Sequence, residues 1–236
     1  LHGHEHYWPP ALLGLGDPAV LAWLLQAPPA VTEQLPSHLQ SRWVDASRLP
    51  STSLPADQIR SAIDAEVAAY RRILGEQPVV VVPPTFVWTR EVEKAWAEAG
   101  LEFIVTPGWR YTQRGADGLP GGDEGPIRHG DRAGGLSYVV RTDYFEPARG
   151  RGASHALQAM YRTVVEGLPC VLENHRDNFI ASAEQAQHSL QELDALLKLA
   201  LQRHPALRFL STFELGSILR DRDPEWIVQP WRDRIP

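Results

Sequence analysis

Three histidines lie within the first six residues of the chain, in the segment Leu-His-Gly-His-Glu-His. Neutral imidazole is a preferred ligand of Zn²⁺, and two imidazoles at positions i and i+4 can converge on one ion. Gly3 permits a tight backbone between them. We therefore expect His2 and His6 to bind one divalent metal ion, with zinc as the expected ion. A tag remnant or a frayed end is the alternative origin of such a stretch, although the following Tyr-Trp-Pro-Pro is typical of native sequence.

A second group of polar residues follows the apolar run Cys170–Leu172. Such a burst of polar side chains is costly to bury unless partners or a ligand satisfy it. On a strand, Glu173 and His175 point to the same face, so the carboxylate can orient the imidazole as a general acid–base histidine requires. We predict catalytic roles for these two residues and substrate contacts for Arg176 and Asn178. The alternative is that an Asp or Asn of this segment caps a helix beginning near residue 181, and both roles can hold together.

Two further loops follow apolar strands and carry aromatic residues. Pro83 and Pro84 end the first strand rigidly, and ligands of α/β folds bind at the carboxyl ends of strands. We therefore predict that Pro84 and Phe86 line a substrate groove. Trp109 follows the next strand and could pack on a sugar face, although a place in the core is equally compatible with its type.

The elements that position these residues alternate along the chain. Val79–Val82 is a β-branched run without polar alternation, typical of a strand buried on both faces of a parallel sheet. The pattern predicts strands at 79–82, 103–106, 137–145, 170–174 and 208–211, and helices at 57–74, 91–99, 154–166 and 181–203. The Gly-rich segment 110–135 is expected to be a long loop. This alternation predicts an α/β fold, either a barrel or a doubly wound sheet.

Composition narrows the class further. The 236 residues carry 23 Lys and Arg against 29 Asp and Glu, a net charge of −6, which argues against nucleic acid as a partner. We predict a single domain over residues 1–236, with residues 9–56 as a Pro-rich irregular helical insertion. The single cysteine excludes an internal disulfide framework. No apolar run approaches the roughly 20 residues that span a bilayer, so no membrane segment is expected. No targeting signal is visible, so the compartment is not predicted.

With these residues assembled, the chain resembles the polysaccharide deacetylase (carbohydrate esterase) superfamily, whose domain is an irregular (β/α)7 barrel of glycoside hydrolase/deacetylase type. His2 and His6 match the spacing of its His-x-x-x-His metal motif. The segment 82–86 matches the Pro-containing loop of its groove, and His175 matches its general acid. The segment 209–215 resembles its closing strand.

The chain also departs from the pattern of that superfamily. The Asp-Asp pair that supplies the catalytic base and a third metal ligand has no counterpart here, so we expect the barrel to be incomplete at its N-terminal end and the polypeptide to continue upstream of Leu1. The Arg before the groove proline is replaced by Val82, and Glu173 stands where a Leu is usual.

The resemblance implies a metal-dependent hydrolase of the polysaccharide deacetylase type. Such an enzyme removes acyl groups from an amino sugar or related substrate, a reaction at carbon–nitrogen bonds other than peptide bonds. The ion lowers the pKa of a bound water, and His175 protonates the leaving amine. Two alternatives stay open. One is an amidohydrolase-like or phosphoesterase metal barrel that uses His2 with His4, and the other is a non-catalytic carbohydrate-binding barrel. A carbohydrate or other small molecule is the expected partner.

Overall fold

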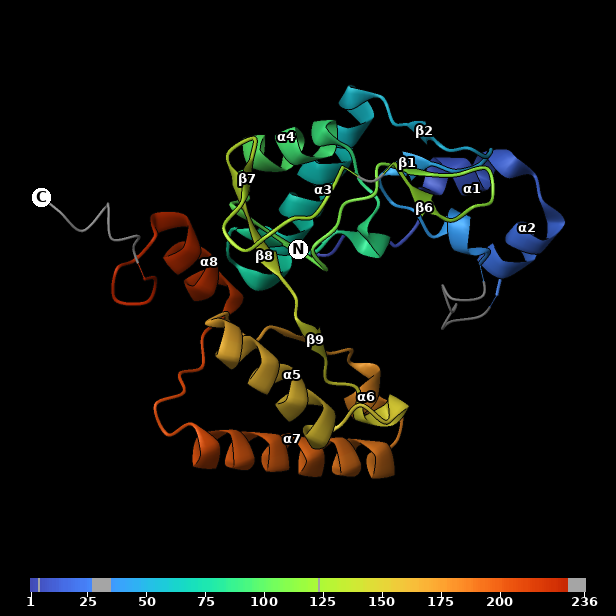
Figure 1. Cartoon of the computed structure of the whole chain (residues 1–236). Helices are drawn as coiled ribbons and strands as arrows, with labels where there is room; N and C mark the ends of the chain where they lie inside the picture. The colour runs from blue at the N-terminus through green and yellow to red at the C-terminus, as the bar shows by residue number, and fades with distance from the viewer. Residues whose placement is uncertain (4, 27–34, 123, 229–236) are drawn as a thin grey trace, which may run out of the picture. The chain divides into compact units, whose positions relative to one another are not determined.

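The computed structural model describes residues 1–3, 5–26, 35–122 and 124–228 (Figure 1). By contacts the chain divides into two compact units. The first comprises Leu1–Val139 and Thr212–Pro236, and the second comprises Val140–Ser211. Helices and strands occur in both units, so the mixed α/β class predicted from the sequence is confirmed. None of the described helices is long and apolar enough to cross a membrane.

The first unit is built on a four-stranded sheet of order β3-β4-β8-β7. The strands are β3 (Val80–Val81), β4 (Phe103–Thr106), β8 (Leu136–Val140) and β7 (Arg132–Ala133). β3 and β4 are parallel, with Val80 beside Phe103, whereas β7 and β8 are antiparallel. Leu1 adds a backbone pairing at the other side of β3, because its nitrogen donates to the Val80 carbonyl and its carbonyl accepts from the Val82 nitrogen.

Two helices cover this sheet with a core rich in tryptophan. α3 (Ala56–Leu74) buries Ile59, Ile63 and Val67, which recur every fourth residue on one face of the helix. α4 (Arg90–Glu98) buries Trp96, whose ring meets Trp43 edge-on with centroids 5.5 Å apart. Each large apolar side chain buried in this way contributes about 1.5–3 kcal/mol, so this cluster is a main source of the unit's stability.

The proline-rich and glycine-rich segments contain more helices and strands than we expected from the sequence. Residues 9–56 contain the short helices α1 (Pro9–Leu15), α2 (Pro18–Leu24) and η2 (Ser37–Leu39), followed by a hairpin of β1 (Val44–Asp45) and β2 (Thr52–Ser53). The predicted long loop 110–135 is interrupted by β7 and by a second hairpin of β5 (Gln113–Arg114) and β6 (Pro120–Gly121). The prediction of one uninterrupted loop was therefore wrong.

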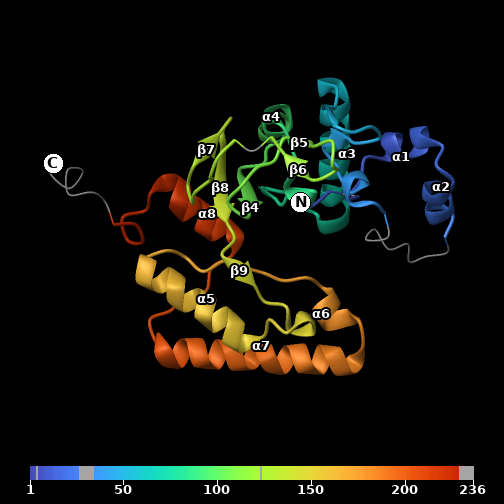
Figure 2. The same ribbon diagram turned by 45° about the vertical axis from the view of Figure 1, so that its right-hand side comes forward.

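The second unit pairs two short parallel strands with a helical layer. β9 (Asp143–Tyr144) lies beside β10 (Leu172–Glu173). After η4 (Pro147–Arg149), α5 (Ala153–Glu166) packs against α7 (Ala183–Arg203), and the two views agree on this arrangement (Figures 1 and 2). Its core holds Phe145, Leu157, Met160 and Leu196. α6 (Asp177–Ile180) precedes α7, and the side chain that caps α7 is Ser182 rather than an Asp or Asn of the 173–178 segment.

The expected closing strand is instead irregular over 208–211 and then helical. α8 (Thr212–Asp221) places Phe213, Gly216 and Arg220 on one face at helical spacing, against Phe103 and Glu102 of the sheet. Because Gly216 has no side chain, α8 can lie close to the Phe103 ring. With this segment helical, no sheet among the described residues closes into a barrel.

Two helical glycines give a matched test of this packing. A Cβ added at Gly216 would lie 2.6 Å from Cδ1 of the fully buried Phe103, whereas a Cβ at Gly14 in α1 would meet nothing within 4 Å. We predict that Gly216→Ala lowers the free energy of unfolding by about 1–3 kcal/mol through overpacking. Gly14→Ala should raise it by about 0.5–1 kcal/mol through helix propensity. Chemical denaturation measures both, and equal effects of the two substitutions would contradict the close approach of α8 to Phe103.

Candidate functional site

The best-organised polar cluster lies at the carboxyl edge of the β9–β10 pair. Glu146 follows β9 by two residues and His175 follows β10 by two residues, and the strands are parallel, so both side chains emerge at the same edge. His175 Nδ1 lies 2.5 Å from Glu146 Oε1, and the His175 backbone nitrogen donates to the same oxygen at 3.1 Å. Because an ionised carboxylate only accepts, Nδ1 carries the proton and Nε2 is presented by a half-exposed ring.

Glu146 is almost fully buried, and its second oxygen is also satisfied. Asn178 Nδ2 donates to Glu146 Oε2 at 3.0 Å. Burial acts to raise the pKa of Glu146, but hydrogen bonds from Asn178 and His175 and the nearby charges of His175 and Arg149 outweigh it and lower the pKa below its ordinary value. Glu146 is therefore an ionised group that holds the imidazole, not a proton donor.

The other side of the ring faces Glu173. His175 Nε2 lies 3.3 Å from Glu173 Oε1, and Arg141 forms an ion pair with Glu173 Oε2. The structure therefore brings together the two residues predicted to be catalytic and adds two that the sequence reasoning missed, Glu146 and Arg141. Glu146 gives little signal in the sequence beyond a lone acidic residue between Phe145 and a proline at the end of a strand.

The two residues of this segment predicted to contact substrate have different environments. Asn178 is fully buried, with its amide nitrogen shared between Glu146 and the His175 carbonyl and its oxygen accepting from the Ala148 nitrogen. We assign it the positioning of the cluster. Arg176 is exposed at the start of α6 and is accessible to a ligand.

A second edge lies in the first unit, at the carboxyl ends of the parallel strands β3 and β4. His2 Nδ1 lies 2.7 Å from the Val82 carbonyl, and His6 Nε2 lies 2.8 Å from His2 Nε2. The carbonyl fixes the Nδ1 proton of His2, so the two Nε2 atoms converge, which is the orientation that metal-binding imidazoles take. His4 lies outside the described residues.

The loops that follow these two strands meet each other. The Tyr111 nitrogen donates to the Phe86 carbonyl at 3.2 Å, and the Trp88 nitrogen donates to the Tyr111 carbonyl at 2.9 Å. Pro84 is buried, and Thr85 and Phe86 adopt φ of 55° and 56°. This left-handed backbone costs non-glycine residues about 1–3 kcal/mol each, so the surrounding structure must hold the loop in place.

Trp109 lies on the loop that follows β4. It is 42% exposed, so it is available to a ligand and is not a core residue. It follows β4 within the same unit as His6.

The sequence reasoning also missed a buried polar cluster behind this second edge. Glu93 Oε1 accepts from Trp88 Nε1 at 2.9 Å and from Arg110 Nη1 at 2.5 Å, and the Tyr138 hydroxyl donates to the same oxygen. Burial and the Glu93 carboxylate raise the pKa of Tyr138, so it stays a hydroxyl donor. Hydrogen bonds to Glu93 join these four side chains in the interior. The cluster therefore stabilises the loops and does not present reactive groups.

The described residues do not form a complete metal site. No group of three or more His, Cys, Asp or Glu side chains among them is placed to hold a metal ion. His2 and His6 supply two convergent ligands, fewer than the three protein ligands usual for catalytic zinc. A zinc-dependent centre therefore stays a prediction, and no chemical step is assigned to a metal.

One family model matches part of the chain. The model of glycosyl hydrolase family 57 matches residues 39–144, which is less than half of the chain. The match runs from η2 to β9 and includes the Pro83–Phe86 and Trp109 loops. Comparison with curated proteins and with solved structures gives no match.

This finding corrects the function expected from the sequence. The resemblance to a carbohydrate-active enzyme is supported at that general level, but the matched family hydrolyses glycosides and is not the polysaccharide deacetylase superfamily. Acyl removal from an amino sugar by a metal-bound water is therefore the wrong assignment. The deacetylase assignment was based on two short motifs, His-x-x-x-His and a histidine after a late strand, which are not specific to one family. The Asp-Asp pair of that superfamily has no counterpart in the sequence.

The buried carboxylate predicts how stability depends on pH. Glu146 has a folded-state pKa below its ordinary value of 4.5, so it stabilises the fold above that pH and the contribution is lost as the pH falls through the folded-state pKa. We predict that Glu146→Gln lowers the free energy of unfolding at pH 7 by about 1–3 kcal/mol and flattens its decline under acid. Glu166→Gln, on the exposed end of α5, is the matched control. The measurement is the melting temperature of the parent, Glu146→Gln and Glu166→Gln proteins between pH 3 and 7. If the melting temperature changes with pH in parallel for all three proteins, this role of Glu146 is refuted.

Binding of a divalent ion by His2 and His6 stays a prediction, and it can be measured directly. A tag-free protein titrated with Zn²⁺ should bind with an affinity that falls at least tenfold in His2→Ala and in His6→Ala. His188→Ala, which removes an exposed imidazole from α7, should leave it unchanged. Because only the neutral imidazole ligates, binding should also weaken below about pH 6. Unchanged calorimetric titrations in both variants would exclude this pair as ligands.

Proposed function

We propose that the chain is a carbohydrate-active hydrolase that cleaves glycosidic bonds, with the Glu146–His175–Glu173 cluster supplying its acid–base groups. The match of the glycosyl hydrolase family 57 model to residues 39–144 carries the reaction class. The cluster supports the choice of residues, because it presents a proton-bearing imidazole held by a buried carboxylate at the carboxyl edge of two parallel strands. We also propose that the chain belongs to the (β/α)7-barrel class expected from the sequence.

The chemistry requires a proton for the leaving sugar and a water for the sugar that remains. His175 in its imidazolium form donates the Nε2 proton to the bridging oxygen, and the bond from that oxygen to the anomeric carbon breaks. Water then adds to the anomeric carbon, and the proton that it loses returns to Nε2, so both products are neutral sugars and the ring is restored. Throughout, Glu146 holds Nδ1–H and fixes the orientation of the ring.

Glu173 is placed for the second role that glycoside cleavage needs. The transition state carries positive charge at the anomeric carbon, and a neighbouring carboxylate stabilises it. Glu173 lies beside His175 Nε2, the ring nitrogen that would also face the scissile bond. Arg141 holds the second carboxylate oxygen of Glu173. Trp109, Phe86 and Arg176 are proposed to contact the sugar, while Pro84 and Asn178 position the segments that carry such contacts.

The proposal predicts a specific pattern of loss. His175→Ala should reduce the rate of glycoside hydrolysis by about 10²- to 10⁴-fold, because a general acid contributes this much to a rate. His188→Ala on α7 is the matched control and should keep the parental rate. The measurement is the release of reducing ends from α- and β-linked glucans, mannans and xylans. A parental protein that releases none, or a His175→Ala variant within a few-fold of the parent, would overturn the assignment.

A further inference from the structure

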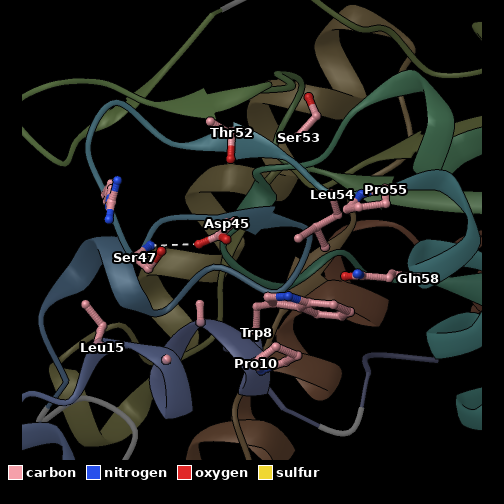
Figure 3. A pocket seen from close by; sticks show the side chains of 13 residues that line it. Trp8, Pro10, Leu15, Asp45, Ser47, Thr52, Ser53, Leu54, Pro55 and Gln58 are labelled. Carbon is pink, nitrogen blue, oxygen red and sulfur yellow. Dashed lines mark hydrogen bonds between the residues drawn. The ribbon is translucent and has the colours of Figure 1, made fainter.

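A cavity of about 620 Å³ opens on the first unit between α1, the β1–β2 hairpin and the beginning of α3 (Figure 3). One wall is apolar and is formed by Trp8, Pro10 and Leu54. The rim is polar and includes Asp45, Arg48 and Gln58. Figure 3 shows Trp8 between Leu54 and Gln58 on one side and Pro10 on the other. The volume falls within the range of about 300–1,000 Å³ that is usual for small-ligand sites.

The aromatic wall is held rigidly from behind. Trp8 is only 7% exposed, and the Arg42 guanidinium lies 5.2 Å from its ring centre. Arg42 is in turn fixed by Glu66, whose Oε1 accepts from Arg42 Nε at 2.9 Å and from Nη2 at 2.6 Å. The ion pair therefore holds Arg42 against the Trp8 ring and restricts the movement of that ring into the space beside it.

The rim, in contrast, holds polar groups whose capacity for hydrogen bonding is unused. Arg48 and Gln58 are exposed, and within the described residues no hydrogen bond or ion pair engages the guanidinium of Arg48 or the amide of Gln58. Asp45 uses Oδ1 to accept from the Ser47 nitrogen at 2.9 Å, which orders the loop and leaves Oδ2 for another donor.

This combination matches the chemistry of a sugar ring. A sugar hydroxyl donates one hydrogen bond and accepts others, so it can donate to Asp45 and accept from Arg48, while the Gln58 amide can do both. The C–H face of the ring is apolar and suits the wall of Trp8 and Leu54. The one acidic and the one basic side chain of the rim balance each other, which favours a neutral ligand over an anion or a cation.

We propose that this cavity is a binding subsite for a neutral saccharide, separate from the residues of the Glu146–His175 cluster. The proposal rests on the proposed function for the chemical class of its ligand. Its lining comes from segments on both sides of the boundary at residue 39 where the family match begins, so the match alone does not assign it.

A substitution that fills the cavity tests this proposal without disturbing the core. Gly14 lines the cavity, and a Cβ added there meets nothing within 4 Å. Gly14→Phe should occupy the space and raise the dissociation constant for a saccharide at least tenfold. Gly14→Ala is the matched control, because it makes the same change to the backbone without filling the cavity. Arg48→Ala and Gln58→Ala should each weaken binding about three- to tenfold.

The probes are malto-, cello- and xylotriose, with binding measured by calorimetry and by ligand-observed NMR on the full chain. The measurements are made in the His175→Ala background, so that cleavage does not consume the probe. Binding that Gly14→Phe abolishes and Gly14→Ala retains supports the subsite. Binding unaffected by Gly14→Phe, or no binding of any probe at millimolar concentration, overturns it. Saccharide binding in a protein that hydrolyses no glycan would refute the proposed function while leaving the subsite in place.

Discussion

A carboxylate buried in a protein must be paired with hydrogen-bond donors or cations, because the cost of removing an unpaired charge from water is several kcal/mol. Three glutamates of this chain, Glu66, Glu93 and Glu146, are nearly inaccessible to solvent. Each is held by donors from distant parts of the sequence, such as Arg42 for Glu66 and Arg110 for Glu93. Replacing these donors with apolar residues would leave uncompensated charges, so the carboxylates constrain which loops can lie together within each unit.

The same constraint fixes the geometry of the Glu146–His175 cluster in the second unit. Glu146 is buried with its oxygens occupied by His175 and Asn178, so the imidazole is held in one tautomer before any ligand binds. An exposed carboxylate at this place would spend part of its time bonded to water and would orient the ring less strictly. The orientation of His175 is therefore set by the requirements of folding, and the proposed catalysis would use an orientation that the fold already maintains.

How far the sequence predicts these features depends on whether the signal is local. The bounds of the buried strand β4 and of the helix α3 are predicted closely. The apolar run Phe103–Thr106 and the recurrence of Ile59 and Ile63 four residues apart are strong local patterns. His175 and Glu173 stand out because they follow an apolar run. Glu146 does not, since its partners lie 29 and 32 residues away. The segment 209–215 was expected to be a strand, whereas α8 begins at Thr212 and packs with Gly216 close to Phe103, a contact between remote segments that no local pattern reveals.

The distribution of satisfied and unsatisfied polar groups separates structural from functional chemistry. Oε1 of Glu93 accepts hydrogen bonds from Trp88 and Arg110 within the fold, and the side chain is buried away from solvent. The cavity beside Trp8 is the opposite case, because its aromatic wall is fixed by the Arg42–Glu66 ion pair while Arg48 and Gln58 stand at its rim without hydrogen bonds among the described residues. Water satisfies such groups in the free protein, so a ligand gains by replacing that water only if its own polar groups match the rim and its apolar face matches the wall. A sugar ring would meet both conditions at once, which is the reason for proposing a saccharide as the ligand of this cavity.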